Sequence, residues 1–104
     1  MKLKVVVLSS GFGNVPDDVA FVEPERVDEF SGWIGGRRWQ MTEIDLPECT
    51  RTSIMPADHE VWGDNGERFF AEANYDEYSR VKSITVFAMK DFSFLWKRTY
   101  PWEG

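Results

Sequence analysis

The stretch RVKSITVFAMK-D-FSFLWKRTYPW, residues 80–102, carries the strongest secondary-structure signal of the chain. Its first part, residues 80–90, is dense in β-branched residues, which favour a strand over the helix that the apolar spacing would also allow. Asp91 then predicts a turn, and residues 92–102 predict a last strand that is limited by Pro101. The C-terminal quarter is therefore expected to be β-structure.

Alternate residues of this last strand share one face, because side chains in a strand project by turns to opposite sides. Five of the six residues on that face are aromatic. The pattern fits the core face of a terminal strand, since buried aromatics cover much apolar area. It also fits a platform for single-stranded nucleic acid or a partner interface. The six residues are Phe92, Phe94, Trp96, Arg98, Tyr100 and Trp102.

Upstream of this stretch, the sequence predicts further strands and one helix. Pro24 suits the first position of a helix, and Gly35 and Gly36 suit its end, so we place the helix near 24–34. In residues 37–46, Trp39 and Met41 are expected to face inward and Thr42 outward. The segment 73–79 is polar and suggests a single helical turn. The other expected strands are 2–8, 19–22, 50–55 and, about an Asn-Gly turn at 63–66, 60–62 and 67–71.

These elements sum to an α+β fold with a β-rich, mostly antiparallel sheet of five to seven strands and one short helix. The length of 104 residues predicts a single globular domain over 1–104. Apolar residues make up 42% of the chain, which is enough for a packed core and argues against disorder. The single cysteine excludes an intramolecular disulfide and favours a cytoplasmic protein. The apolar runs are too short for a membrane-spanning helix.

Charge is unevenly spread along a chain whose net charge is −6. Residues 17–29 and 43–77 are acidic, whereas residues 78–104 are basic and rich in aromatics. The acidic body argues against simple nucleic-acid binding and favours a basic partner, whose approach it would steer. Solubility alone also explains a charge of this size.

The chain offers weak candidates for catalysis or metal binding. Asp58, His59 and Glu60, with Asp64 and Glu67, lack the ligand pattern of a calcium loop or a zinc site. Cys49 lies between Glu48 and Thr50, and a neighbouring carboxylate disfavours the thiolate that a nucleophile needs. The glycine-containing loop at 9–14 lacks the spacing of a phosphate-binding motif. We therefore expect no enzyme activity, no cofactor and no metal.

The leading hypothesis is a small acidic, non-catalytic protein-binding domain. Its size and charge are typical of an inhibitor or immunity-type protein, as phages and mobile elements encode, that blocks a basic surface of its target, such as a nucleic-acid-binding surface. The sequence also leaves a homodimer open, because an exposed terminal strand can pair with its copy. The expected partner-binding residues are Asp17, Asp18, Asp28, Glu29, Trp33, Trp39 and Trp62.

The alternative hypothesis is a nucleic-acid-binding module that uses the C-terminal aromatic strand. Stacking of bases on the aromatics and contacts from cations to phosphates would carry the binding. The residues for this function are Arg37, Arg38, Trp96, Lys97, Arg98, Tyr100 and Trp102.

Overall fold

The structure of the chain, a computed structural model, describes residues 1–11, 15–34, 36–53 and 60–103, with only the backbone for 31–34. Its strands form two antiparallel sheets. The small sheet has the order β2-β1-β3, with β1 at Lys2–Leu8, β2 at Asp18–Val22 and β3 at Trp39–Asp45. The large sheet has the order β4-β5-β6-β7-β8. Its strands are Arg51–Thr52, Val61–Trp62, Arg68–Tyr75, Val81–Lys90 and Ser93–Pro101.

The α+β class is confirmed, with mostly antiparallel strands and one short helix. The eight described strands divide into two sheets, where the sequence predicted one sheet. The helical segment begins as a 3-10 turn at Pro24–Arg26, named η1, and continues as α1 at Val27–Ile34. Pro24 occupies the start of this segment, where its missing N–H has no helical partner. In the part of the chain that the structure describes, no helix is long and apolar enough to cross a membrane.

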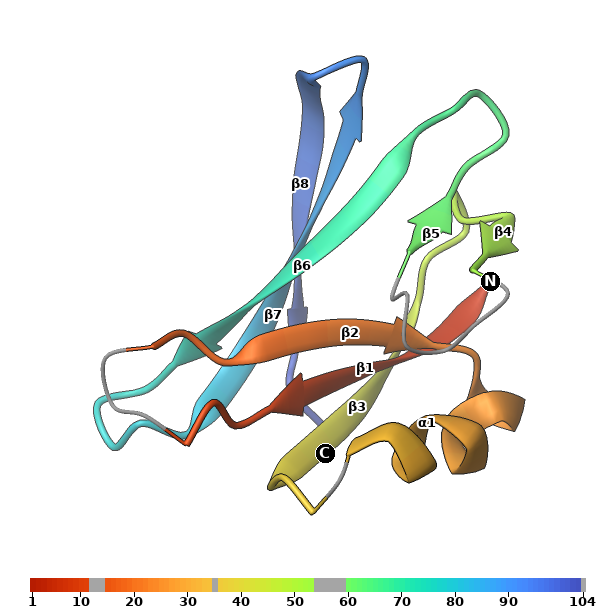
Figure 1. The fold of residues 1–104 in the computed structure, drawn as a ribbon. Helices are drawn as coiled ribbons and strands as arrows, with labels where there is room; N and C mark the ends of the chain where they lie inside the picture. The colour runs from red at the N-terminus through yellow and green to blue at the C-terminus, as the bar shows by residue number, and fades with distance from the viewer. Residues whose placement is uncertain (12–14, 35, 54–59, 104) are drawn as a thin grey trace.

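The small sheet forms the middle layer of the molecule, between α1 and the large sheet (Figure 1). Strand β1 is therefore buried on both faces. Its residues Leu3, Val5 and Val7 join the main core with the large sheet, whereas Val6 and Leu8 pack with Phe30 of α1. A continuous apolar run suits such a doubly covered strand.

Strand β3 corrects the predicted orientation of residues 37–46. Thr42 and Ile44 face the main core, where they are 3% and 4% exposed, whereas Trp39 is 37% exposed. Met41 packs on the side of α1. The prediction failed because both faces of β3 are covered, so the apolar pattern has no single inward phase. The register with β1 has no shift, so no bulge is needed at Ile44.

Strand β8 does not keep one aromatic face along its length. Trp96 pairs with Ala88, but Phe94 pairs with Met89, so Leu95 is an extra residue that forms a bulge. Because a bulge reverses the alternation, Trp96 packs on the main core with Tyr100. Phe94 instead lies on the opposite face and is 57% exposed.

Two other local predictions change. The segment 73–79 contains no helical turn, because β6 continues to Tyr75 and a turn follows it. The predicted strand at 50–55 is described only as β4, Arg51–Thr52, and residues 54–55 lie outside the described residues.

Candidate functional site

An open cleft lies at the end of the molecule where the loop after β1 meets the end of β6. It consists of two hollows that share Asp17 and Tyr75, and we call it the Tyr75 cleft. The larger hollow measures about 470 Å³ and the smaller about 320 Å³. The larger is lined by Val7, Ser9, Asp17, Arg38, Trp39, Gln40, Tyr75 and Ser79. The smaller is lined by Pro16, Asp17, Asp18, Val19, Ala71, Glu72, Ala73 and Tyr75.

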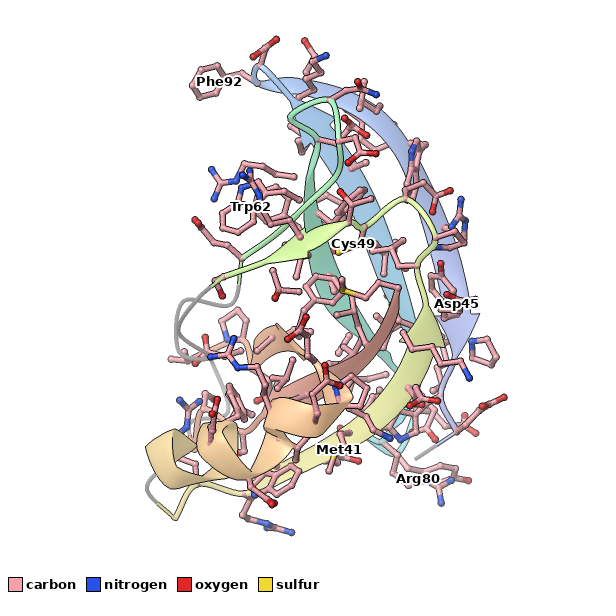
Figure 2. The ribbon with its side chains drawn as sticks, turned by 90° about the vertical axis from the view of Figure 1, so that its right-hand side faces the viewer. Met41, Asp45, Cys49, Trp62, Arg80 and Phe92 are labelled. Atoms are coloured by element: carbon pink, nitrogen blue, oxygen red, sulfur yellow. The ribbon has the colours of Figure 1, made fainter. Side chains whose placement is uncertain are left out.

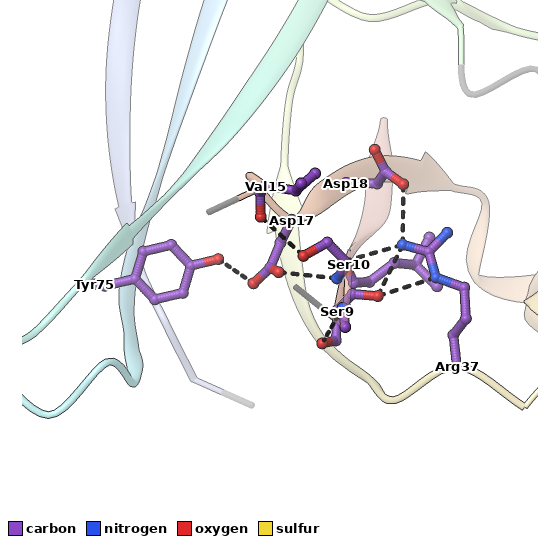
Figure 3. Close-up of polar contacts among 9 residues, drawn as sticks. Ser9, Ser10, Val15, Asp17, Asp18, Arg37 and Tyr75 are labelled. Atoms are coloured by element: carbon purple, nitrogen blue, oxygen red, sulfur yellow. Dashed lines mark hydrogen bonds and ion pairs between the residues drawn. The ribbon is translucent and has the colours of Figure 1, made fainter. Parts of the chain in front are cut away.

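A hydrogen bond between Tyr75 and Asp17 separates the two hollows (Figure 3). The Tyr75 hydroxyl donates to Asp17 Oδ2 at 2.5 Å, and the Ser10 backbone N–H donates to Asp17 Oδ1 at 3.1 Å. Burial, together with the adjacent Asp17 carboxylate, raises the pKa of Tyr75 to about 12. The phenol is therefore protonated at neutral pH and keeps its role as donor.

Arg37 fixes the rim of the cleft by joining the segment before β3 to the ends of β1 and β2. Its Nε and Nη2 donate to the Ser9 carbonyl at 3.0 Å and 2.9 Å. Nη2 also pairs with Asp18 Oδ2 at 3.0 Å. A guanidinium suits this role because it offers several donors in one plane.

The walls of the Tyr75 cleft combine exposed aromatic rings with charges of both signs. Trp39 and Tyr75 are 37% and 39% exposed. Arg38 is exposed beside Trp39 and makes no side-chain hydrogen bond or ion pair with the residues that the structure describes. The carboxylates are Asp17, Asp18 and Glu72. Trp, Tyr and Arg are the residue types that dominate binding energy at protein interfaces.

The structure brings together only part of the predicted partner-binding set. Asp17, Asp18 and Trp39 lie at the Tyr75 cleft. The other acidic residues, Asp28 and Glu29, lie on α1, where Glu29 pairs with Arg26 at 2.9 Å.

The two remaining tryptophans of the set are not part of the cleft. Trp62 is half-buried on β5, with the Arg51 guanidinium 4.8 Å from its ring centre. Trp33 belongs to α1, and its side chain lies outside the described residues.

The alternative, nucleic-acid-binding set is divided among three places. Arg37 and Arg38 lie at the Tyr75 cleft. Lys97 lies on the opposite face of β8 from Arg98, which forms a two-pronged ion pair with Glu48 at 3.0 Å and 2.9 Å. Trp96, Tyr100 and Trp102 pack against the main core and are half-buried.

Sequence reasoning missed Tyr75 and Glu72 as site residues. The segment that contains Tyr75 was recognised as polar and tyrosine-bearing, but its interpretation as a helical turn gave it no neighbours. Extending the strand at 67–71 to Tyr75 would have placed both residues along β6. The contact of Tyr75 with Asp17 spans 58 positions of sequence, so it needs the tertiary fold.

The described residues offer little for metal or nucleophile chemistry. No group of three metal-ligating side chains gathers among them. Cys49 is 2% exposed, and burial raises the pKa of its thiol, which disfavours a reactive thiolate. Asp58 and His59, which a metal cluster or a Cys–His pair would need, lie outside the described residues.

Fold and site together define a small α+β domain with an open cleft of mixed polarity at one end. Comparisons with protein-family models, curated proteins and solved structures found no match to this chain.

Proposed function

We propose that this protein is a small, cytoplasmic, non-catalytic protein-binding domain. In this proposal it is an inhibitor or immunity-type protein, of the kind that phages and mobile elements encode. It binds a basic surface of a target protein, such as a surface that itself binds nucleic acid, and blocks it.

The observation that carries the proposal is the composition of the Tyr75 cleft. Two half-exposed aromatic side chains, Trp39 and Tyr75, stand beside the carboxylates Asp17, Asp18 and Glu72. An aromatic ring supplies contact area at low cost in conformational entropy, and carboxylates attract and orient basic side chains. The apolar floor of the smaller hollow suits the aliphatic stem of a lysine or arginine. It is formed by Val19, Ala71 and Ala73.

The carboxylates of the cleft are held in place before a partner arrives. Asp17 accepts two hydrogen bonds and Asp18 pairs with Arg37. Such preorganisation lowers the entropic cost of binding. It also means that a partner cation shares Asp18 with Arg37, so binding at this position depends on the geometry of the partner as well as on its charge.

The proposal is tested by removing two charges from the cleft, with Asp18→Asn and Glu72→Gln in one variant. The control carries Glu25→Gln and Asp64→Asn, which are exposed carboxylates outside the cleft lining, so the net charge changes equally. Immobilised wild-type and variant proteins are compared for retention of lysate proteins at low and high salt. Affinities for the retained protein are then measured by calorimetry.

We expect the wild type to retain a basic protein that high salt releases. The cleft variant should bind that protein at least tenfold more weakly, and the control should match the wild type. Equal loss in both variants would reduce the effect to net charge and contradict a role for the cleft.

A further inference from the structure

The large sheet has a second face, turned away from the small sheet and from α1. Along β7, Ile84, Val86 and Ala88 are fully buried in the main core. The residues between them therefore point to the opposite side, which we call the outer face. Register places Phe70 and Lys97 beside Phe87 on this face.

Aromatic and apolar side chains gather on the part of the outer face near the turn between β7 and β8. The rings of Phe70 and Phe87 stack with their centres 5.7 Å apart and their planes at 24°. Phe94 pairs with Met89 in the next row. Phe92, at the tip of the hairpin, points away from the rest of the molecule (Figure 2). The exposed members are Phe70 at 38%, Phe92 at 103%, Phe94 at 57% and Leu95 at 45%.

Positive charge accompanies this patch. Lys82, Lys90 and Lys97 of the hairpin are exposed and make no ion pair with the described residues. Residues 78–104 are also the basic part of an otherwise acidic chain. Beyond the aromatic row, hydroxyl and amide groups cover the outer face. They belong to Asn74, Ser83, Thr85 and Thr99.

We propose that the outer face binds single-stranded nucleic acid, independently of the Tyr75 cleft. Unpaired bases stack on exposed aromatic rings of an antiparallel sheet, and lysines beside the rings contact the phosphates. Phe94 and the Phe70–Phe87 pair supply the rings, and Lys97 lies in the same row as Phe87. A chain of net charge −6 disfavours a duplex, whose affinity comes mainly from phosphate contacts.

Pairing of two copies through the edge of β8 is the competing explanation for the exposed patch, and the strand carries features that oppose it. A bulge at Leu95 interrupts the edge, Lys97 places a charge in its middle, and Pro101 removes a donor near its end. Each of these devices protects an edge strand from pairing. The unpaired lysines favour an anionic ligand instead.

The test is fluorescence anisotropy of a labelled thymidine dodecamer at about 20 and about 200 mM salt, the range over which phosphate contacts weaken. The variant carries Phe94→Ala and Lys97→Gln, both on exposed side chains. The control carries Tyr78→Ala and Arg38→Gln, which remove one exposed aromatic and one unpaired cation elsewhere. Circular dichroism verifies that both variants keep the fold.

We expect binding at low salt that falls with added salt, with affinity at least tenfold weaker in the outer-face variant and unchanged in the control. Lys97→Gln alone should reduce the slope of log K against log salt by about 0.7, the value for one phosphate contact on a single strand. Absence of binding at low salt, equal loss in the control, or equal affinity for the matching duplex would each overturn the proposal. So would concentration-dependent dimerisation that Phe94→Ala abolishes in the absence of any oligonucleotide binding.

Discussion

At the scale of single residues, the turn between β7 and β8 combines backbone strain with exposure. Lys90 pairs with Ser93, and the two residues between them, Asp91 and Phe92, have φ of 50° and 66°. This is the pattern of a type I′ turn, where glycine or asparagine is preferred. Phe92 gains no burial in return for its left-handed conformation, because its side chain is fully exposed.

Phe92→Gly should therefore raise the free energy of unfolding by about 0.5–1 kcal/mol, since relief of the left-handed strain exceeds the entropy that glycine adds to the unfolded chain. Urea unfolding followed by tryptophan fluorescence measures the change. Phe92→Ala is the control, because it removes the ring and keeps the strain. If alanine stabilises as much as glycine, the ring and not the backbone is the cause.

Tyr75 makes a second residue-scale prediction. Tyr75→Phe should lower the free energy of unfolding at pH 7 by about 1 kcal/mol, the usual value of one hydrogen bond. The pKa of Tyr75 in the folded protein is raised from 10.0 to about 12. Its contribution is thus complete below pH 10 and is lost as the pH rises towards 12.

Urea unfolding of wild type and Tyr75→Phe at pH 7, 9 and 11 tests this dependence. The difference between the two proteins should stay constant up to about pH 10 and shrink above it. A difference that grows above pH 10 would contradict the donor role of the Tyr75 hydroxyl.

At the scale of elements, β1 is the strand on which both hydrophobic clusters converge. Val5 packs towards the large sheet and Val6 towards α1, and each is fully buried. Val5→Ala and Val6→Ala should each lower the free energy of unfolding by about 2 kcal/mol, and the double variant by nearly the sum, because the two sites face opposite layers. Thermal and urea unfolding measure all three. A loss below about 0.5 kcal/mol for Val6→Ala would mean that α1 does not cover this face.

The elements also show where the sequence was informative. The apolar run of residues 2–8, Pro24 and the β-branched density of 80–90 each indicated the correct element, because these signals are local. The phases of β3 and β8 were not predictable in the same way. β3 has two covered faces, and the bulge at Leu95 separates Phe94 from Trp96 although their spacing in the sequence is regular.

The candidate site was predictable only in part for the same reason. Asp17, Asp18 and Trp39 stood out by charge or by residue type. Their grouping with Tyr75 depends on β6 ending beside the loop that precedes β2, which is a property of the tertiary fold.

At the scale of the whole molecule, Arg98 and Glu48 join the last strand of the large sheet to the segment that follows β3. The pair is two-pronged, and Arg98 lowers the pKa of the Glu48 carboxyl. The contribution of Glu48 to stability is therefore present above its ordinary value of 4.5 and is lost as the pH falls through the lowered folded value.

Glu48→Gln should lower the free energy of unfolding at pH 7 by up to about 1 kcal/mol, because both partners are partly exposed to solvent. The difference from wild type should vanish at strongly acidic pH. Glu43→Gln is the control, since its pair with Lys4 lies within one sheet at 3.6 Å. Urea unfolding at pH 7 and about pH 3 checks both variants, and an effect of Glu43→Gln as large as that of Glu48→Gln would contradict the special role of the inter-sheet pair.

The double burial of β1 has a consequence during protein synthesis. The ribosome releases the N-terminus first, so β1 can pair with β2 and then β3, and α1 can cover one of its faces, while the chain is still growing. The other face, with Leu3, Val5 and Val7, waits for β7, which begins only at Val81. A nascent chain of about 80 residues therefore presents a bare apolar sheet to the cytosol, and ribosome-associated chaperones should engage it until β7 emerges.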